Sequence, residues 1–264
     1  MPTYSPLHLD WPGLLNARDL GGMPLSGGGV VAERAIVRAE SFSWLRPDGV
    51  EAARAYGLGR IIDLRLPAET VRYPHPFADE PDVYVNLPVQ EPDDPEEGPW
   101  AHLYEGMLER RPKLFARAVG AVADAPEGPV AVHCAAGKDR TGLVVAFTLS
   151  LAGADDALIA DDYELTSTRL APREAGYAAV MDRARAAHEE ARAARRAAGE
   201  QADGDDDLPV WLHPARRIAV TRDIILETLA YVRSAYGSIG GYLEGGGLTA
   251  AQQEKLVRRV RGEI

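Results

Sequence analysis

The only cysteine in the chain, Cys134, lies in the segment His133–Thr141, which reads HCAAGKDRT, and Arg140 follows it six positions later. A turn of small residues at the start of a helix gathers backbone N–H groups, and the helix end adds partial positive charge. Such a turn binds oxyanions and favours the thiolate form of a cysteine within it. A guanidinium beside the turn can bind two oxygens of one phosphate group. The segment therefore predicts a nucleophile and an anion-binding arginine on one loop.

Apolar runs on both sides of this loop predict the elements that position it. Residues 129–134 (PVAVHC) read as a buried strand, and residues 141–153 (TGLVVAFTLSLAG) read as a buried helix that ends at Gly153. Cys134 then stands at the carboxyl end of a strand, where open α/β sheets bind their ligands.

Strand and helix patterns alternate through the first 153 residues, and only helical patterns follow from Asp155 onward. The strands are apolar without alternation, which is typical of a sheet covered on both faces. We therefore predict an α/β fold: a central, mostly parallel sheet flanked by helices, with an all-helical C-terminal third. We expect a single domain over residues 1–264, with an α/β core at 1–153 and a helical cap or flank at 154–264. The predicted strands cover residues 29–39 (one strand or a strand pair), 60–65, 82–89 and 129–134. The predicted helices cover 46–57, 100–125 with a break at Pro112, and 141–153.

The composition limits the classes of partner. A net charge of −11 argues against nucleic acid or an anionic membrane surface as the main partner. No apolar stretch reaches the roughly 18 residues that span a bilayer, and the first residues lack the pattern of a secretory signal. A single cysteine excludes disulfides within the chain and multi-thiolate zinc sites, which favours a reducing cytoplasmic location. None of the six histidines lies in a two-histidine ligand motif, so we expect neither a metal nor a cofactor.

Three other interpretations of the cysteine loop compete with this one. A lone cysteine at a strand end is often only a small buried apolar residue. The presence of Gly137 and Lys138 between Cys134 and Arg140 disfavours that interpretation. A nucleotide-binding loop would need glycine in place of Val132 and serine or threonine in place of Asp139. A sulfur-transfer enzyme could also use a cysteine in an anion-binding loop, but arginine followed by threonine favours phosphate.

The segment HCAAGKDRTG resembles the signature of the cysteine-dependent protein tyrosine phosphatase superfamily, which is His-Cys, five residues, then Arg and Ser or Thr. The form AGKDRTG is similar to that of the bacterial atypical tyrosine phosphatases, which also act on phosphoinositides. Three further stretches agree with this resemblance, and because they lie near both ends it covers nearly the whole chain. They are NARDLGG at 16–22, IIDLR at 61–65 and YGSIGGYL at 236–243.

The resemblance implies a role for each loop residue. Cys134 would attack phosphorus and form a phosphocysteine intermediate, and Arg140 with the loop N–H groups would bind the equatorial oxygens. The Thr141 hydroxyl would hydrogen-bond the sulfur, and His133 would orient the loop rather than transfer protons. The residues expected to bind the phosphate group are Ala135, Ala136, Gly137, Lys138, Asp139, Arg140 and Thr141.

The expected activity is that of a protein tyrosine phosphatase acting on a phosphorylated protein. A phosphoinositide or inositol phosphate phosphatase is the alternative, because Lys138 could contact a second phosphate. Against it, phosphoinositide-selective relatives carry a lysine directly after the cysteine, where this chain has Ala135. A catalytically inactive phosphate-binding module is a third hypothesis, which the presence of both Cys134 and Arg140 disfavours.

The superfamily usually supplies the general acid as an aspartate from a separate loop. The acidic segment QEPDDPEEGP lies between a predicted strand and a long helix and offers Asp93 and Asp94. Asp139, inside the phosphate loop, competes with them. Asp63 also ends a strand near the crevice, but we expect it to form a structural ion pair with Arg65 or Arg18.

The alanine-rich segment Glu174–Gln201 is strongly helical and has no large apolar residue after Met181. This pattern predicts a solvated helix, and a lid over the active site is the alternative. The acidic segment 203–209 (DGDDDLP) after it reads as a linker.

Overall fold

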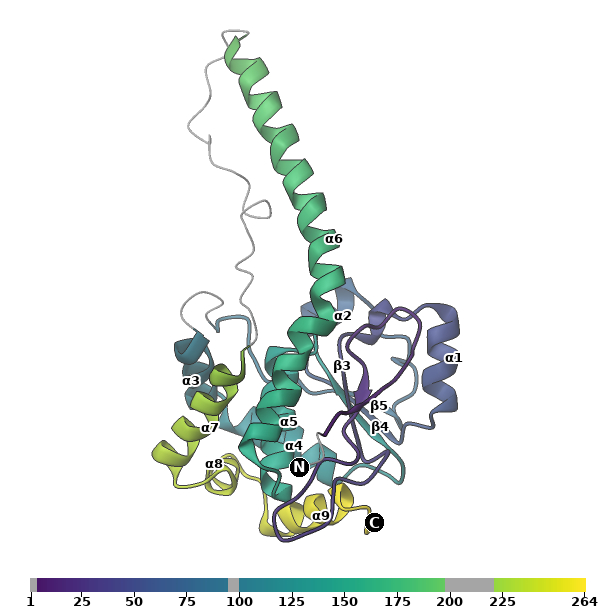
Figure 1. Cartoon of the computed structure of the whole chain (residues 1–264), viewed down its shortest axis with the longest axis vertical. Coiled ribbons are helices and arrows are strands. Elements are labelled where there is room, and N and C mark those ends of the chain that lie inside the picture. The colour runs from purple at the N-terminus through teal and green to yellow at the C-terminus, as the bar shows by residue number, and fades with distance from the viewer. Residues whose placement is uncertain (1–3, 95–99, 198–220) are drawn as a thin grey trace. The chain divides into compact units, whose positions relative to one another are not determined.

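The computed structural model describes residues 4–94, 100–197 and 221–264 (Figure 1). The chain forms two compact units. The first comprises residues 1–166 and 220–264, and the second comprises residues 167–219. All described residues of the second unit are helical.

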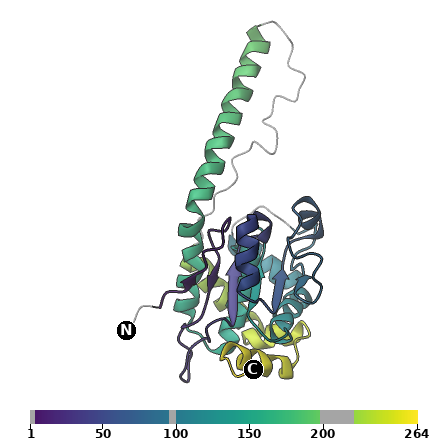
Figure 2. The same ribbon diagram turned by 90° about the vertical axis from the view of Figure 1, so that its right-hand side faces the viewer.

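A six-stranded sheet forms the centre of the first unit, in the order β1-β2-β3-β6-β4-β5 (Figures 1 and 2). The pairs β3–β6, β6–β4 and β4–β5 are parallel, whereas β1–β2 and β2–β3 are antiparallel. The mostly parallel sheet and the helices around it confirm the predicted α/β fold. The strands are β1 Leu7–His8, β2 Arg18–Asp19, β3 Ile36–Ala39, β4 Arg60–Asp63, β5 Tyr84–Asn86 and β6 Val130–His133.

Both faces of the sheet are covered, as the unbroken apolar strand patterns predicted. Alternate strand residues point into two separate cores. Val37, Ile61 and Ala131 belong to the core that also holds Trp11 and Phe42. The other strand residues, such as Ile36, Ile62 and Val132, belong to the larger core beneath the helices α4 (Pro112–Ala123) and α5 (Asp139–Ala152).

Proline and glycine residues determine where several helices begin and end. Pro112 is the first residue of α4 and separates it from α3 (Trp100–Arg110), because proline is tolerated in a first helical turn but not inside a helix. Gly153 ends α5 in the left-handed conformation, with φ of 91°. The other helices are the 3-10 helix η1 Phe42–Trp44, α1 Pro47–Ala55, α2 Pro67–Arg72, α6 Asp156–Ala197, α7 Arg222–Tyr236, α8 Ile239–Gly245 and α9 Ala250–Val260.

The C-terminal helices flank the sheet rather than extend it. Helices α8 and α9 pack against α4 and α5, and α7 packs against α3, α5 and α8. Of the predicted solvated helix, residues 174–197 are helical in α6; residues 198–201 and the predicted linker at 203–209 lie outside the described residues. Within the described ranges, none of the helices has the length and apolar character needed to cross a membrane.

The register of the three central strands sets the position of the cysteine. His133 at the end of β6 pairs with Ala39 at the end of β3 on one side and with Asp63 at the end of β4 on the other. Because the three strands are parallel, the residues that follow them meet at one edge of the sheet. The cysteine loop therefore begins between the segments that follow Ala39 and Asp63.

Candidate active site

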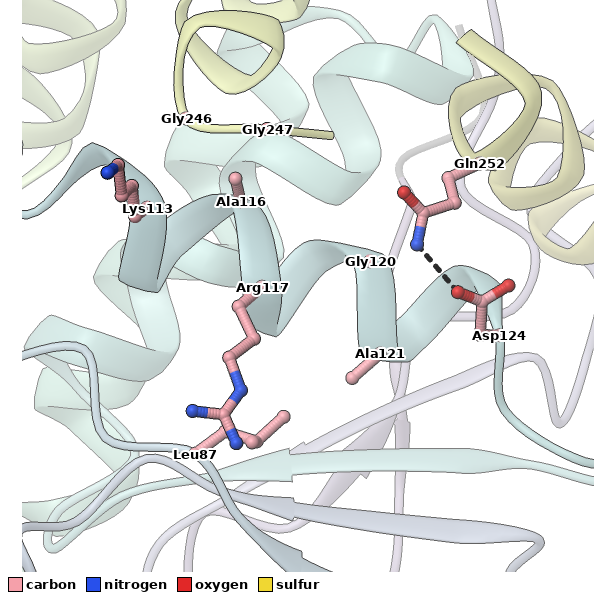
Figure 3. Close-up of a pocket in the computed structure, with 10 residues that line it drawn as sticks. All are labelled: Leu87, Lys113, Ala116, Arg117, Gly120, Ala121, Asp124, Gly246, Gly247 and Gln252. Atoms are coloured by element: carbon pink, nitrogen blue, oxygen red, sulfur yellow. Dashed lines mark hydrogen bonds between the residues drawn. The ribbon is translucent and has the colours of Figure 1, made fainter. Parts of the chain in front are cut away.

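One pocket of the first unit lies away from the cysteine loop. It has a volume of about 340 Å³ and lies between α4, the turn that joins α8 to α9, and the segment after β5 (Figure 3). Lys113, Arg117, Asp124 and Gln252 contribute its polar side chains, and Asp124 accepts a hydrogen bond of 2.6 Å from Gln252. None of the residues that the sequence singled out for chemistry lines it.

The cysteine loop joins β6 to α5, as the sequence predicted. Cys134 follows the last residue of β6, is 2% exposed, and α5 begins at Asp139. Ala135 is exposed, whereas Ala136 and Lys138 are half-buried. The Cys134 thiol is therefore accessible only to a group that enters the loop.

Side chains from outside the loop bind its carbonyl oxygens. Asn16 Nδ2 donates to the carbonyls of Ala136 and Gly137, both at 3.3 Å. Arg38 Nη2 donates to the carbonyl of Gly137 at 2.8 Å. All peptide bonds of the described residues are trans, so the N–H of each following residue points to the opposite side of the chain. The N–H groups of Gly137 and Lys138 therefore point away from Asn16 and Arg38, and in this direction they can contribute to a nest for an anion.

Glu40, which follows β3, fixes the segment that carries Asn16. Its carboxylate accepts hydrogen bonds from the backbone N–H groups of Leu15, at 2.6 Å, and Asn16, at 2.9 Å. The backbone N–H of Ser41 donates to the carbonyl of Ala135 at 3.1 Å. Segments before β2 and after β3 therefore hold the outer side of the loop together.

Gly137 is required at its position for two reasons. Its φ of 67° is in the left-handed region, which L side chains rarely adopt. A Cβ at this position would lie 2.3 Å from the carbonyl oxygen of Ala39. Any other residue would therefore push the loop away from β3.

Glu69 on α2 binds the guanidinium of Arg140. The two hydrogen bonds, from Nη1 to Oε2 and from Nη2 to Oε1, measure 2.5 and 3.0 Å. Burial disfavours the charged guanidinium, but the Glu69 carboxylate and Cys134 outweigh it and raise the pKa of Arg140 above its ordinary value. Burial acts to raise the pKa of Glu69, but the hydrogen bonds and the charge of Arg140 outweigh burial, and the pKa is lowered. Glu69 also caps α2 by accepting from the backbone N–H of Leu66 at 2.8 Å.

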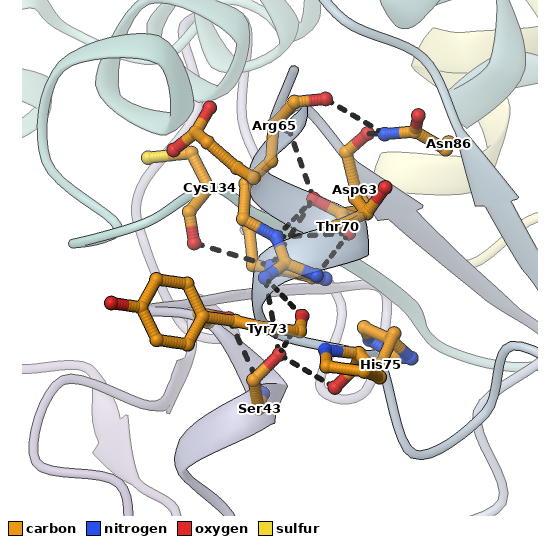
Figure 4. Close-up of polar contacts among 12 residues, drawn as sticks. Ser43, Asp63, Arg65, Thr70, Tyr73, His75, Asn86 and Cys134 are labelled. Carbon is orange, nitrogen blue, oxygen red and sulfur yellow. Dashed lines mark hydrogen bonds and ion pairs between the residues drawn. The ribbon is translucent and has the colours of Figure 1, made fainter. Parts of the chain in front are cut away.

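An ion pair between Asp63 and Arg65 lies under the loop (Figure 4). Arg65 Nε donates to both carboxylate oxygens at 3.0 and 3.1 Å, and Nη2 donates to Oδ2 at 2.7 Å. Burial acts to raise the pKa of Asp63, but His133 and Arg65 lower it to about 2. Asp63 is therefore a structural carboxylate, which confirms the predicted pairing with Arg65. Arg18, the other predicted partner, binds Asp162 instead.

His133 packs in a stack of rings below the cysteine. Its ring lies 4.9 Å from that of Phe42 and 5.1 Å from that of His75, both nearly parallel to it. Burial lowers the pKa of His133, so the ring is neutral near pH 7. Nδ1 lies 3.3 Å from the carbonyl oxygen of Cys134. A neutral, fully buried ring with this contact fits the orienting role that the resemblance implies.

Asp63, His75 and His133 could in principle hold a metal ion, because their ligand atoms lie within 4.8 Å of one another. The carboxylate, however, already accepts three hydrogen bonds from the Arg65 guanidinium. A second cation beside this guanidinium would be repelled, and all three residues are buried. These side chains do not fit a metal centre.

The acidic residues offered as general acids differ in their surroundings. Asp94 is buried and binds Arg110 at 3.0 Å and Arg111 at 3.1 Å. Asp93 is 78% exposed at its side chain and binds Arg111 at 2.8 Å. The two arginines therefore tie this segment to the end of α3, and residues 95–99 of the predicted acidic loop lie outside the described residues.

Asp139 belongs to a chain of hydroxyl groups. Tyr104 donates to Asp139 Oδ1 at 2.6 Å, and the hydroxyls of Tyr104 and Tyr163 lie 2.7 Å apart. Burial, followed by the charge of Asp139, raises the pKa of both tyrosines, so both remain protonated donors. Asp139 is thereby oriented from α3 and α6.

A buried group of charges joins the loop to the start of α6. Asp162 accepts hydrogen bonds from Arg18 and from Arg38, both at 2.6 Å, and Arg38 also holds the loop carbonyl described above. Burial acts to raise the pKa of Asp162, but the two arginines lower it. The carboxylate therefore remains charged and fixes the guanidinium that supports Gly137.

Thr141 shows one difference from what the resemblance implies. Its hydroxyl is buried and has no hydrogen-bond partner among the described residues. The bond to the cysteine sulfur is therefore not formed in this structure.

Sequence reasoning missed most of the supporting residues. Asn16 lies within the quoted stretch NARDLGG, but no role followed from that stretch alone. Glu69 carries a local signal, since it is the third residue of a helix that begins with proline and completes its capping box. Asp162 and Tyr104 carry no signal that distinguishes them from other polar helix residues.

The comparison with known proteins decides the family. The model of the family described as "Tyrosine phosphatase family" matches residues 9–261. The chain belongs to the tyrosine phosphatase family. The resemblance stated from the cysteine loop is thereby confirmed over most of the chain.

A curated relative belongs to the same group of enzymes. The chain is 36% identical over 137 residues to the triple specificity protein phosphatase PtpB of Mycobacterium tuberculosis. The match covers 52% of this chain and 44% of that protein, so the chain spans less than half the length of this relative.

Proposed function

We propose that this member of the family hydrolyses phosphomonoesters, foremost phosphotyrosine in proteins, through a phosphocysteine intermediate. One observation carries the proposal: Cys134 lies in a loop whose carbonyls are bound from outside, while Arg140 is held at its end by two hydrogen bonds. A guanidinium has five N–H donors, and Glu69 uses two of them. Of the remaining three, Nε–H and the second Nη2–H lie on one edge and can donate to two oxygens of a bound phosphate, together with the loop N–H groups.

The reaction has two steps. In the first, the Cys134 thiolate attacks phosphorus, the P–S bond forms, and the P–O bond to the leaving group breaks. The leaving oxygen takes a proton from an acid, and the alcohol or phenol departs. In the second step, water attacks the phosphocysteine, the P–S bond breaks, and inorganic phosphate leaves with the thiolate restored. Arg140 and the N–H groups of the loop stabilise the charge on the equatorial oxygens in both steps.

For the general acid we propose Asp139, with Asp93 as the alternative. Asp139 is in the loop itself, next to Arg140, and its described hydrogen bond involves Oδ1 alone. Asp94, which is buried between two arginines with a lowered pKa, is unsuited to give up a proton near neutral pH. Lys138 and Thr141 complete the proposed phosphate-binding set with Ala135, Ala136, Gly137, Asp139 and Arg140.

The breadth of the substrate range belongs to the same proposal. The curated relative is called a triple specificity phosphatase, which supports activity beyond phosphotyrosine. A phosphoinositide headgroup is our second candidate substrate, and Lys138 is the residue that would meet its additional phosphate. A reducing cytoplasmic location is also proposed, because the mechanism needs Cys134 as a thiol and the chain has no second cysteine to protect it.

The test is a comparison of rates on a phosphotyrosine peptide, a phosphoserine peptide and a phosphoinositide, followed by rapid acid quench. We expect phosphotyrosine to be the fastest substrate and a phosphate group to be trapped on Cys134. A wild-type protein that binds phosphate but forms no phosphocysteine with any substrate would be a binding module, not an enzyme.

A further inference from the structure

Two exposed aromatic rings stack on each other beside α2. Trp44, at the end of η1, is 52% exposed, and Tyr73, directly after α2, is 49% exposed. Their ring centroids lie 6.3 Å apart with an interplanar angle of 29°. Among the described residues, this is the one ring pair in which both members are exposed. We call Trp44, Tyr73 and the neighbouring Arg72 the aromatic platform.

Polar contacts hold the backbone beneath the platform. Arg65 Nη1 donates to the carbonyl of Tyr73 at 3.0 Å and to Ser43 Oγ at 3.1 Å. Ser43 Oγ donates to the same carbonyl at 2.8 Å. Figure 4 shows Ser43 and Tyr73 gathered around Arg65, with the ring of Tyr73 pointing away from it. The Asp63–Arg65 pair therefore fixes the backbone from which the rings project. A ligand can then bind the rings without the entropy cost of ordering this segment.

The platform is connected directly to the phosphate loop. The backbone N–H of Tyr73 donates to the carbonyl of Glu69 at 2.9 Å, so the two residues are one helical turn apart. Glu69 in turn binds Arg140. One turn rises about 5.4 Å, and an extended peptide advances about 3.3 Å per residue. Residues two to four positions from a phosphotyrosine held in the loop can therefore reach the rings.

The chemistry of the platform selects one kind of occupant. Two stacked rings offer an apolar face, and Arg72, whose guanidinium lies 5.4 Å from the Tyr73 ring centroid, offers positive charge. Arg72 has no acidic partner among the described residues. A bilayer with anionic headgroups is disfavoured by the net charge of −11. Two rings are also far smaller than the roughly 1,200 Å² that a stable contact with a second copy requires.

We propose that the aromatic platform binds an apolar or aromatic residue, with an acidic residue beside it, that flanks the phosphotyrosine of a protein substrate. This proposal rests on the proposed function and names the substrate feature that the same site prefers. Trp44 and Tyr73 would thus determine specificity without taking part in the phosphate chemistry.

The experiment compares four substrates: a small aryl phosphate, a phosphotyrosine peptide with Phe, Leu and Glu flanks, the same peptide with Ser and Gly flanks, and phosphoinositide vesicles. We expect the wild type to prefer the apolar peptide by about three- to tenfold in kcat/KM, the range that one aromatic contact provides. Trp44→Ala and Tyr73→Ala should abolish this preference and leave the rate on the aryl phosphate unchanged. Trp44→Phe and Tyr73→Phe, which keep a ring, should retain most of it. The control is Leu7→Ala, which removes an exposed apolar side chain on β1.

Three outcomes would overturn the platform while leaving the phosphatase proposal intact. The first is a wild type that is active on the aryl phosphate but indifferent to the peptide flanks. The second is a loss in the variants confined to phosphoinositide vesicles, which would assign the rings to a lipid surface. The third is equal losses on the aryl phosphate and on both peptides, which would show that the rings only support the fold. No activity of the wild type on any of these substrates would refute the proposed function itself.

Discussion

The Glu69 carboxylate binds the Arg140 guanidinium through two hydrogen bonds, at 2.5 and 3.0 Å. The contact joins α2 to the first turn of α5, and both partners are largely buried. Since Glu69 occupies only one edge of the guanidinium, it orients Arg140 without closing the edge that faces the loop. Glu69 is therefore a positioning residue of the site.

Loss of Glu69 should lower turnover more than stability. A hydrogen bond to a charged group contributes about 1.5–3 kcal/mol, so Glu69→Ala should reduce kcat by roughly ten- to a hundredfold. Glu69→Gln, which keeps one acceptor oxygen, should lose less. The measurements are kcat, KM and vanadate affinity beside thermal unfolding, with Glu51→Gln on α1 as the control. An unchanged kcat in Glu69→Ala would mean that Arg140 does not need this partner.

Cys134→Ser should abolish turnover while the loop still binds anions, because a serine hydroxyl stays protonated at neutral pH and is a far weaker nucleophile than a thiolate. Arg140→Lys should also cost several orders of magnitude, since an ammonium group cannot bind two oxygens in a plane. Rates on an aryl phosphate and the affinity for vanadate test both variants. More than about a hundredth of the wild-type rate in Cys134→Ser would contradict the covalent mechanism.

The general acid can be identified from the leaving group. If Asp139 protonates the leaving oxygen, Asp139→Asn should slow phosphotyrosine hydrolysis more than hydrolysis of an aryl phosphate with an activated leaving group. Asp93→Asn is the competing variant, and Tyr104→Phe removes the hydroxyl that orients Asp139. Kinetics on the two substrates distinguish the candidates. The same loss on both substrates would remove Asp139 from this role.

The outer support of the loop should affect anion binding directly. Bound phosphate should protect Cys134 from alkylation by iodoacetamide, because it fills the loop in front of the sulfur. In Arg38→Lys, which cannot bind Asp162 and the Gly137 carbonyl together, half-protection should need about tenfold more phosphate. Whole-protein mass spectrometry reports on this single thiol, with Arg46→Lys on the surface as the control. Protection equal to that of the wild type would show that the loop keeps its shape without Arg38.

Acid should weaken the fold through Asp63. The pKa of Asp63 is about 2, below its ordinary value of 3.8. Its contribution to the free energy of unfolding is therefore complete above pH 3.8 and is lost as the pH falls toward 2. That difference corresponds to roughly 2 kcal/mol in the free energy of unfolding. Urea unfolding between pH 5 and pH 2 should show a steeper fall in the wild type than in Asp63→Asn, with exposed Asp82→Asn as the control. Identical slopes would mean that Asp63 gains no stabilisation from Arg65 and His133.

The parts of the site that were predicted from the sequence are those that depend on neighbours along the chain. Apolar runs predicted the strand and helix around Cys134, and Pro112 predicted the break between α3 and α4. Asp63 and its partner Arg65 are only two positions apart. Small residues in the loop predicted a nest for an anion. These inferences use local backbone preferences, which the final packing did not override.

The supporting contacts could not be predicted, because they join residues that only the tertiary fold brings together. Glu69 and Arg140 are 71 positions apart, and Arg38 and Asp162 are 124 positions apart. A carboxylate on a predicted helix has many arginines as candidate partners, and composition does not choose among them. The stacked rings of Trp44 and Tyr73 were missed for the same reason.

Strand β6, which directly precedes Cys134, is the last of the six strands to be synthesised, yet it lies inside the sheet between β3 and β4. Long-range pairing of this kind closes large chain loops and forms slowly. Until β6 enters, β3 and β4 each leave one edge unpaired, and such edges invite aggregation. A nascent chain that ends before β6 therefore contains all the remaining strands of the sheet. The position between β3 and β4, after which the phosphate loop follows, is still unfilled. During refolding, helical signal should return before the proposed phosphatase activity does, so the recovery of that activity would measure the closure of the sheet.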